Sequence, residues 1–151
     1  MCKIIFITSA VAVMLTSSSS SWGKESKDVP YQSLPPGTSV DVGGYRLHFK
    51  VTSGRKPTVL LEAGGGLDSS SWDAVQEPLA RATGSRVISY DRAGLGSSDA
   101  ATYGSYDIVK EVTALHRGLE KLGLTDNLIL VGMSYGAFLV QERIKGSGLH
   151  I

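Results

Sequence analysis

Three short apolar runs constrain the fold of this chain more than any other feature of its sequence. They occupy residues 58–62 (TVLLE), 86–90 (RVISY) and 127–131 (NLILV), and none of them alternates between apolar and polar residues. Strands that are buried on both faces have this composition, and such strands belong to parallel sheets covered by helices. The runs therefore predict an α/β fold with a mostly parallel sheet flanked by helices.

Helical and hairpin patterns occupy the segments around these strands. Residues 107–122 carry an apolar stripe at helical spacing, and Gly123 stands where a glycine would end that helix. Further helices are predicted near residues 72–82 and after Ser134. Before the first run, apolar residues alternate with polar ones, as in a half-buried strand, at Tyr45, Leu47, Phe49 and Val51. The pair Gly43-Gly44 predicts a hairpin turn that joins this strand to residues 39–42, and His48 is expected on the solvated face.

The first 39 residues are predicted to precede the folded domain. Residues 4–15 (IIFITSAVAVML) form an apolar run after Lys3 and before a series of serines, which predicts a signal peptide over residues 1–21 and export to the periplasm or beyond. A buried strand or helix at the edge of the domain is the alternative for this run. Residues 22–39 are polar and contain three prolines, as in a linker or arm, and the domain is expected over residues 40–151.

Composition gives no support for several classes of partner. Lys plus Arg number 15 and Asp plus Glu 14, and this net charge of +1 gives no reason to expect nucleic acid or an anionic membrane. The sequence contains no run of roughly 18 apolar residues, so no membrane-spanning helix is predicted. The single cysteine, Cys2, lies within the predicted leader, so a mature chain would form no disulfide. Neither a metal site nor a cofactor is predicted.

The pentapeptide Gly132-Met133-Ser134-Tyr135-Gly136 has the pattern G-x-S-x-G. It follows the third apolar run directly and precedes the apolar residues 137–140, so it occupies a strand-to-helix turn. A nucleophile elbow needs this placement, and glycines on both sides of its serine avoid clashes with neighbouring chain segments. The hydroxyl then lies at a helix N-terminus, which favours developing negative charge. The pattern predicts Ser134 as a catalytic nucleophile.

A second glycine-rich segment, Gly64-Gly65-Gly66, follows the first apolar run. Glycines allow backbone amides to approach the oxyanion of an acyl-transfer intermediate without obstruction by side chains. We predict that the amides of Gly65 and Tyr135 form an oxyanion hole, with Gly64 and Gly66 beside the substrate. A plain turn and a phosphate-binding loop are the alternatives; the second fits poorly, because Ser69 replaces the third glycine of G-x-G-x-x-G.

A third turn, residues 91–98 (DRAGLGSS), follows the second run and is interpreted as structural, with Asp91 capping it. Together the three elements resemble the α/β-hydrolase family over about residues 40–143. The resemblance implies Ser134 as nucleophile, an oxyanion loop that usually reads His-Gly-x and here reads Ala63-Gly64-Gly65, and a triad in the order Ser, acid, His, which excludes Asp91. Because the elbow residue is serine, the aspartate-dependent haloalkane dehalogenases and epoxide hydrolases are disfavoured.

The resemblance implies a serine hydrolase that forms an acyl-enzyme from a small ester or related acyl compound. In such proteins the triad acid and histidine come later. After Ser134, Glu142 lies about 12 Å further along the same helix, and His150 would have to fold back around the sheet. We therefore expect a domain truncated after the elbow helix and a 151-residue chain that is inactive or nearly so.

A catalytically inactive or partner-binding remnant is the alternative function. The strand at residues 127–131 is expected to lack a neighbour on one side, and an open sheet edge of this kind favours self-association. A nucleotide-binding fold is a weaker third hypothesis.

Overall fold

The computed structural model describes residues 3–6, 37–104 and 107–146. In chain order the elements are β1 (Lys3–Phe6), β2 (Thr38–Asp41), β3 (Arg46–Val51), β4 (Arg55–Glu62), the short 3-10 helix η1 (Ser69–Trp72), α1 (Asp73–Thr83), β5 (Ser85–Asp91), α2 (Ile108–Lys121), β6 (Leu128–Gly132) and α3 (Tyr135–Gly146). The three apolar runs form β4, β5 and β6, and the three predicted helices are present. The predicted α/β architecture is confirmed.

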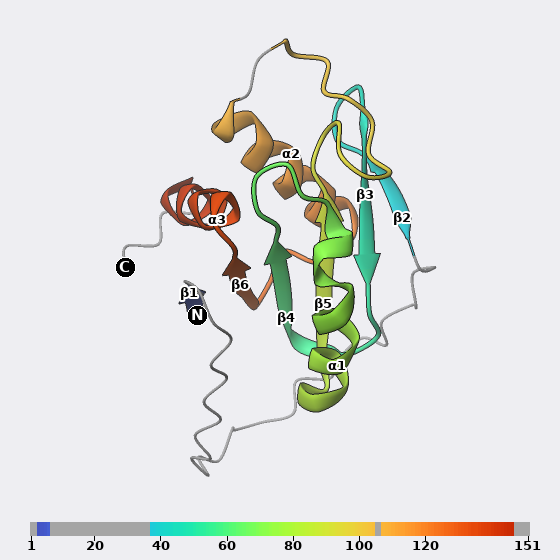
Figure 1. Cartoon of the computed structure of the whole chain (residues 1–151), viewed down its shortest axis with the longest axis vertical. Coiled ribbons are helices and arrows are strands. Elements are labelled where there is room, and N and C mark those ends of the chain that lie inside the picture. Colours follow the sequence, from blue (N-terminus) through green and yellow to red (C-terminus); the bar gives the residue numbers. More distant parts are fainter. Residues whose placement is uncertain (1–2, 7–36, 105–106, 147–151) are drawn as a thin grey trace.

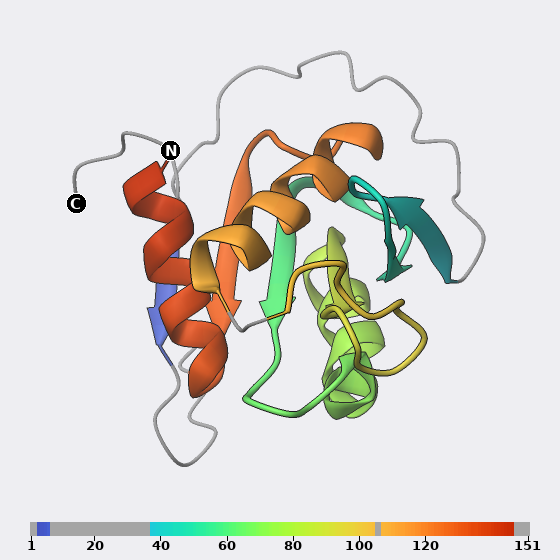
Figure 2. The same cartoon turned by 90° about the horizontal axis from the view of Figure 1, so that it is seen from above.

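The strands form one mixed, mostly parallel sheet in the order β1-β6-β4-β5-β3-β2 (Figure 1). Strands β1, β6, β4 and β5 run parallel, whereas β3 is antiparallel to β5 and β2 is antiparallel to β3. Helix α1 covers one face, and α2 and α3 cover the other (Figure 2). The crossovers from β4 to β5 and from β5 to β6 each contain a helix, as parallel strands require.

Burial on both faces explains why the central strands lack alternation. On β4, Leu60 belongs to the apolar core beneath α2 and α3, whereas its neighbours Val59 and Leu61 belong to the core beneath α1. The pairs Val87 and Ile88 on β5 and Leu130 and Val131 on β6 divide in the same way. Consecutive side chains point to opposite faces of a strand, so a strand covered on both sides needs apolar residues throughout.

The β2–β3 hairpin adopts the predicted turn. Gly43 and Gly44 have φ values of 116° and 97°, and the Val42 amide donates to the Tyr45 carbonyl at 2.9 Å. Strand β2 begins at Thr38, two residues before the predicted domain boundary. His48 was predicted to be solvated but is half-buried, with Nδ1 3.4 Å from the Ser39 hydroxyl, because the adjacent β2 strand covers it.

The outer edge of β6 is not open in the structure, and the prediction of a missing neighbour was wrong for the described residues. Strand β1 lies parallel to β6, from Lys3 opposite Ile129 to Phe6 opposite Gly132. Its sequence, KIIF, includes two β-branched isoleucines, which suit a strand and supply backbone partners for the β6 edge. The structure thus places the start of the apolar run as the alternative interpretation expected, at the edge of the sheet.

The rest of the predicted leader and most of the predicted linker, residues 7–36, lie outside the described residues. Within the described ranges, no helix has the length and apolar character needed to cross a membrane.

Candidate active site

The three glycine-containing segments meet at one end of the sheet, where the parallel strands have their carboxyl ends. Parallel strands end at the same edge, and β4 and β6 end in register, with Glu62 opposite Gly132. Strand β5 ends beside them at Asp91. The glycine loop, the turn after Asp91 and the G-x-S-x-G turn therefore emerge side by side, where open α/β sheets bind ligands.

The strand–turn–helix placement of Ser134 is confirmed. Met133 and Ser134 form the turn between β6 and α3, and Ser134 has a left-handed φ of 53°. Such a conformation in a residue with a side chain costs about 1–3 kcal/mol and is frequent at active sites. The side chain is exposed, and the Ala137 amide donates to the Ser134 carbonyl at 2.9 Å to begin the helix. Ser134 thus lies exposed between the end of β6 and the N-terminus of α3.

Both flanking glycines are required by close approaches of the backbone. A Cβ added to Gly132 would lie 2.7 Å from the Ala137 Cα, and one added to Gly136 would lie 2.7 Å from the Ala63 carbonyl oxygen. Real Cβ atoms essentially never come within 3.0 Å of such atoms. The predicted reason for the two glycines is therefore confirmed.

The glycine loop after β4 lies against the elbow. The Met133 amide donates to the Glu62 carbonyl at 3.0 Å, which ties the end of β4 to the turn. A Cβ built on Gly65 would lie 3.5 Å from the Tyr135 Cβ, so these two residues are neighbours. Gly64 packs against Met133, and Gly66 turns the loop with a φ of 70°. The structure thus brings together the residues that the sequence predicted for the oxyanion hole and its surroundings.

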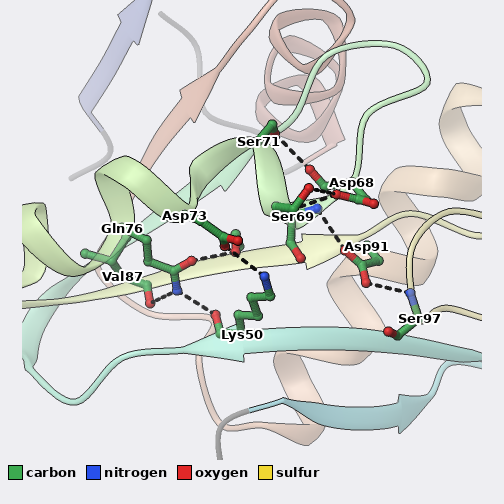
Figure 3. A network of polar contacts seen from close by, with 11 residues as sticks. Lys50, Asp68, Ser69, Ser71, Asp73, Gln76, Val87, Asp91 and Ser97 are labelled. Atoms are coloured by element: carbon green, nitrogen blue, oxygen red, sulfur yellow. Dashed lines mark hydrogen bonds and ion pairs between the residues drawn. The ribbon is translucent and has the colours of Figure 1, made fainter.

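Asp91 has the structural role that the sequence predicted. Its carboxylate accepts hydrogen bonds from the amides of Ser69 and Ser97, each at 2.8 Å (Figure 3). Its carbonyl accepts one from the Ser98 hydroxyl at 2.6 Å. The carboxylate fills the space beside Gly96, where a Cβ would collide with it. Asp91 therefore joins the loop after β4 to its own turn and fixes their relative position.

A buried polar network beneath the elbow was not predicted. Glu62 is 1% exposed, and the Tyr90 hydroxyl donates to its two carboxylate oxygens at 3.0 and 3.3 Å. Burial raises the pKa of Glu62 to about 7, although the Tyr90 hydrogen bond and the charges of Arg92 and Arg143 oppose this rise. A carboxylate that closes the apolar run TVLLE was the signal in the sequence that could have revealed this group.

Two further members of the network, Arg92 and Glu111, were also missed. Arg92 is buried and donates to the Ala63 carbonyl at 2.8 Å. Burial raises the pKa of Glu111, while the nearby charge of Arg92 and the Tyr135 hydroxyl, 3.5 Å from each carboxylate oxygen, lower it. Arg92 is a charged residue beside Asp91 in an otherwise apolar and glycine-rich turn, and this placement was the signal in the sequence that could have indicated its buried role. Nothing in the helical pattern distinguished Glu111 from a surface residue.

The histidines within the described ranges lie in other environments. His48 faces Ser39 across the β2–β3 ladder, and the exposed His116 lies 3.4 Å from Glu120 on α2. Neither of them forms an interaction with Ser134. His150 lies outside the described residues. In the described part of the chain, Ser134 therefore has no imidazole in contact that could accept its proton.

Comparison with known proteins finds a family model, curated relatives and solved structures that resemble this chain. A family model described as "Alpha/beta hydrolase family" matches residues 59–151. The chain is 32% identical over 105 residues to a proline iminopeptidase of Lactobacillus helveticus (strain DPC 4571), covering 64% of this chain and 34% of that protein. It is 31% identical over 107 residues to "Probable transporter efuK" of Hormonema carpetanum, covering 68% of this chain and 15% of that protein.

Among solved structures, the bromoperoxidase from Bacillus anthracis matches with a TM-score of 0.66 and 30% identity, covering 75% of this chain and 40% of that one. The chain spans 15% and 34% of the length of the two curated relatives. Residues 59–151, which the family model matches, contain the carboxyl ends of β4, β5 and β6, the glycine loop and the elbow.

Proposed function

The chain belongs to the alpha/beta hydrolase family, and from this premise we propose that it carries the nucleophile and the oxyanion hole of a serine hydrolase. The exposed Ser134, held at a φ of 53° between β6 and α3, is the observation that carries the proposal. The adjacency of Gly65 and Tyr135 supports it, because two backbone amides at this position suit the oxyanion of acyl transfer.

The proposed reaction begins with attack of the Ser134 Oγ on an acyl carbon. A bond forms between Oγ and this carbon, the bond from the carbon to the leaving group breaks, and the leaving group takes up the proton that Oγ loses. Water then hydrolyses the acyl-enzyme, which releases the free acid and restores the Ser134 hydroxyl. The Gly65 and Tyr135 amides would bind the oxyanion in both steps, and Gly64 and Gly66 would line the acyl group. The relatives' names indicate different reactions, so the substrate class, a small ester or related acyl compound, is proposed from the site alone.

The elbow can be tested with a nucleophile that needs no histidine. We expect Ser134→Cys, combined with Cys2→Ser, to be acetylated by p-nitrophenyl acetate about 100-fold faster than Ser53→Cys in the same background. The helix N-terminus favours the thiolate at position 134, and the two amides stabilise the tetrahedral intermediate. Ser53 is an exposed residue in the loop before β4, at the opposite edge of the sheet. Release of p-nitrophenolate and the mass of the acetylated chain give the two rates; equal rates would contradict the proposal.

The matched control is the unmodified 151-residue chain. Serine is a weak nucleophile without a general base, and no described histidine contacts Ser134. A fluorophosphonate probe should therefore leave the chain unlabelled. Labelling that disappears in Ser134→Ala would show instead that the chain is active as it stands.

A second candidate function is a non-catalytic remnant that binds a partner. The described histidines, which contact Ser39 and Glu120 instead of Ser134, favour it. Under this proposal the S134C chain would show no advantage over S53C in acylation, so the experiment above distinguishes the two functions.

We also propose that residues 1–21 act as a signal peptide and that the mature chain is exported, on the evidence of the apolar run after Lys3. The first part of this run forms β1 in the structure. Cleavage would therefore remove β1 and expose the amides and carbonyls of the β6 edge, which would favour self-association.

Deletion of residues 1–21 is expected to produce a larger share of dimers or higher species than the intact chain forms. Light scattering after size-exclusion chromatography at equal concentrations measures this difference, and circular dichroism establishes that both forms are folded. Identical monomeric masses would show that the β6 edge does not need β1 as a cover.

A further inference from the structure

Arg92 lies buried behind the glycine loop, with 3% of its surface exposed. Its Nη1 donates a hydrogen bond to the Ala63 carbonyl at 2.8 Å, and its Nη2 donates to the carbonyls of Gly64 and Leu67, the latter at 3.2 Å. A guanidinium group is planar and presents its donors in a fixed geometry. One side chain from the turn after β5 thus holds three carbonyl groups of the loop after β4.

The bond to Gly64 also fixes the direction of the Gly65 amide. A trans peptide unit is planar, and its C=O and N–H groups point in opposite directions. The Gly64 carbonyl points at Arg92, so the N–H of Gly65 points away from it. Glycine residues have wide conformational freedom, and a loop of three glycines needs an external partner to hold one amide direction. Among the described residues, no acceptor receives a hydrogen bond from the Gly65 amide.

Arg92 also contacts the residue that carries the second predicted donor. The centre of its guanidinium lies 5.4 Å from the centroid of the Tyr135 ring, within the range of a cation–π contact. The positive charge of Arg92 also interacts with two carboxyl groups, those of Glu62 and Glu111. Burial raises the pKa of Glu62 and of Glu111, and the positive charge of Arg92 opposes the rise in both. The buried charge is therefore placed where it can act on both halves of the site.

We propose that Arg92 is the positioning residue of the oxyanion hole. It holds the Gly64–Gly65 peptide unit so that the Gly65 amide faces the elbow. Its contact with Tyr135 fixes the position of the Tyr135 amide relative to the Gly65 amide. The inference rests on the proposed function, because it assigns Arg92 to the same site. Arg92 itself does not contact the substrate.

The test compares two reactions of the same thiol in the S134C, C2S chain. Acetylation by p-nitrophenyl acetate passes through a tetrahedral oxyanion: the thiolate forms a bond to the acyl carbon, and p-nitrophenolate leaves. Alkylation by iodoacetamide displaces iodide and forms no oxyanion. The ratio of the two rates therefore reports oxyanion stabilisation separately from the reactivity of the thiol. Arg92→Met and Arg92→Lys are measured beside Arg86→Met, a matched control.

Arg86 suits this purpose because it is also buried and also donates to a loop carbonyl, that of Gly54. It stands six residues earlier on β5, about 20 Å away at the opposite edge of the sheet. We expect R92M to lower the ratio about tenfold and R92K to restore less than half of that loss, because the compact ammonium of lysine lacks the planar, forked donor geometry of the guanidinium. R86M should leave the ratio unchanged.

Amide relaxation of Gly64 and Gly65, measured by NMR on ¹⁵N-glycine-labelled chain, supplies a second measurement. These amides should become more mobile in R92M and stay ordered in R86M. An unchanged ratio and unchanged mobility in a folded R92M chain would overturn the inference. If S134C is acylated no faster than S53C before any change at Arg92, the proposed function fails instead, so the two failures are distinguishable.

Discussion

Replacing Gly136 by alanine is expected to lower the free energy of unfolding by more than about 3 kcal/mol. Helix propensity alone predicts the opposite, because alanine stabilises a helix by about 1 kcal/mol relative to glycine. The added methyl group would lie 2.7 Å from the Ala63 carbonyl and closer still to the carbonyl of Glu62. Neither carbonyl can move away without losing a hydrogen bond, because Arg92 donates to the Ala63 carbonyl and the Met133 amide donates to the Glu62 carbonyl. Urea denaturation followed by circular dichroism measures the loss.

Gly104→Ala is the matched control for this variant. A Cβ at Gly104 meets no atom within 4 Å, and its φ is not in the left-handed region. The substitution should change the free energy of unfolding by less than about 0.5 kcal/mol. Equal stability of the Gly136→Ala and unmodified chains would mean that the elbow helix is not held against the end of β4.

Glu62 is expected to make the stability of the chain fall by about 3 kcal/mol between pH 4.5 and pH 8. Burial raises the pKa of this carboxyl from 4.5 to about 7. Between these two values the folded chain holds the proton and the unfolded chain has lost it, so each step up in pH favours unfolding. The contribution is fully present below pH 4.5 and is lost as the pH rises through about 7.

Glu62→Gln isolates this effect. Glutamine has a similar shape and can still accept a hydrogen bond from Tyr90, but it does not titrate. The difference in unfolding free energy between the two chains, measured by urea denaturation across the range, should favour the unmodified chain at low pH by about 3 kcal/mol more than at pH 8. Parallel curves for the two chains would show that Glu62 ionises at its ordinary pKa.

Local patterns predicted the central sheet well, because they reflect burial directly. The unbroken runs at β4, β5 and β6 follow from coverage on both faces, and the alternation at β3 follows from coverage on one. The elbow was predictable for a similar reason: Gly132 and Gly136 are required by contacts within a few residues of the turn or with the strand beside it.

Contacts between distant segments were harder to predict. The Arg92 side chain binds a loop about 28 residues earlier, and its role depends on which carbonyls face it, which no sequence pattern records. The start of the apolar run after Lys3 fits both a leader and a strand, because both need the same apolar residues. In the structure β1 pairs with β6, whereas the signal-peptide role of the same residues is a separate proposal.

The pairing of β1 with β6 has a consequence for the newly made polypeptide. Lys3 lies opposite Ile129, so each residue of β1 leaves the ribosome 126 positions ahead of its partner. At cellular rates of synthesis this interval lasts roughly 6 to 25 seconds. Throughout that time the isoleucines of β1 have no strand to join and remain open to targeting factors and chaperones. If residues 1–21 act as the proposed signal peptide, this delay lets a targeting factor bind them before β6 is available for pairing.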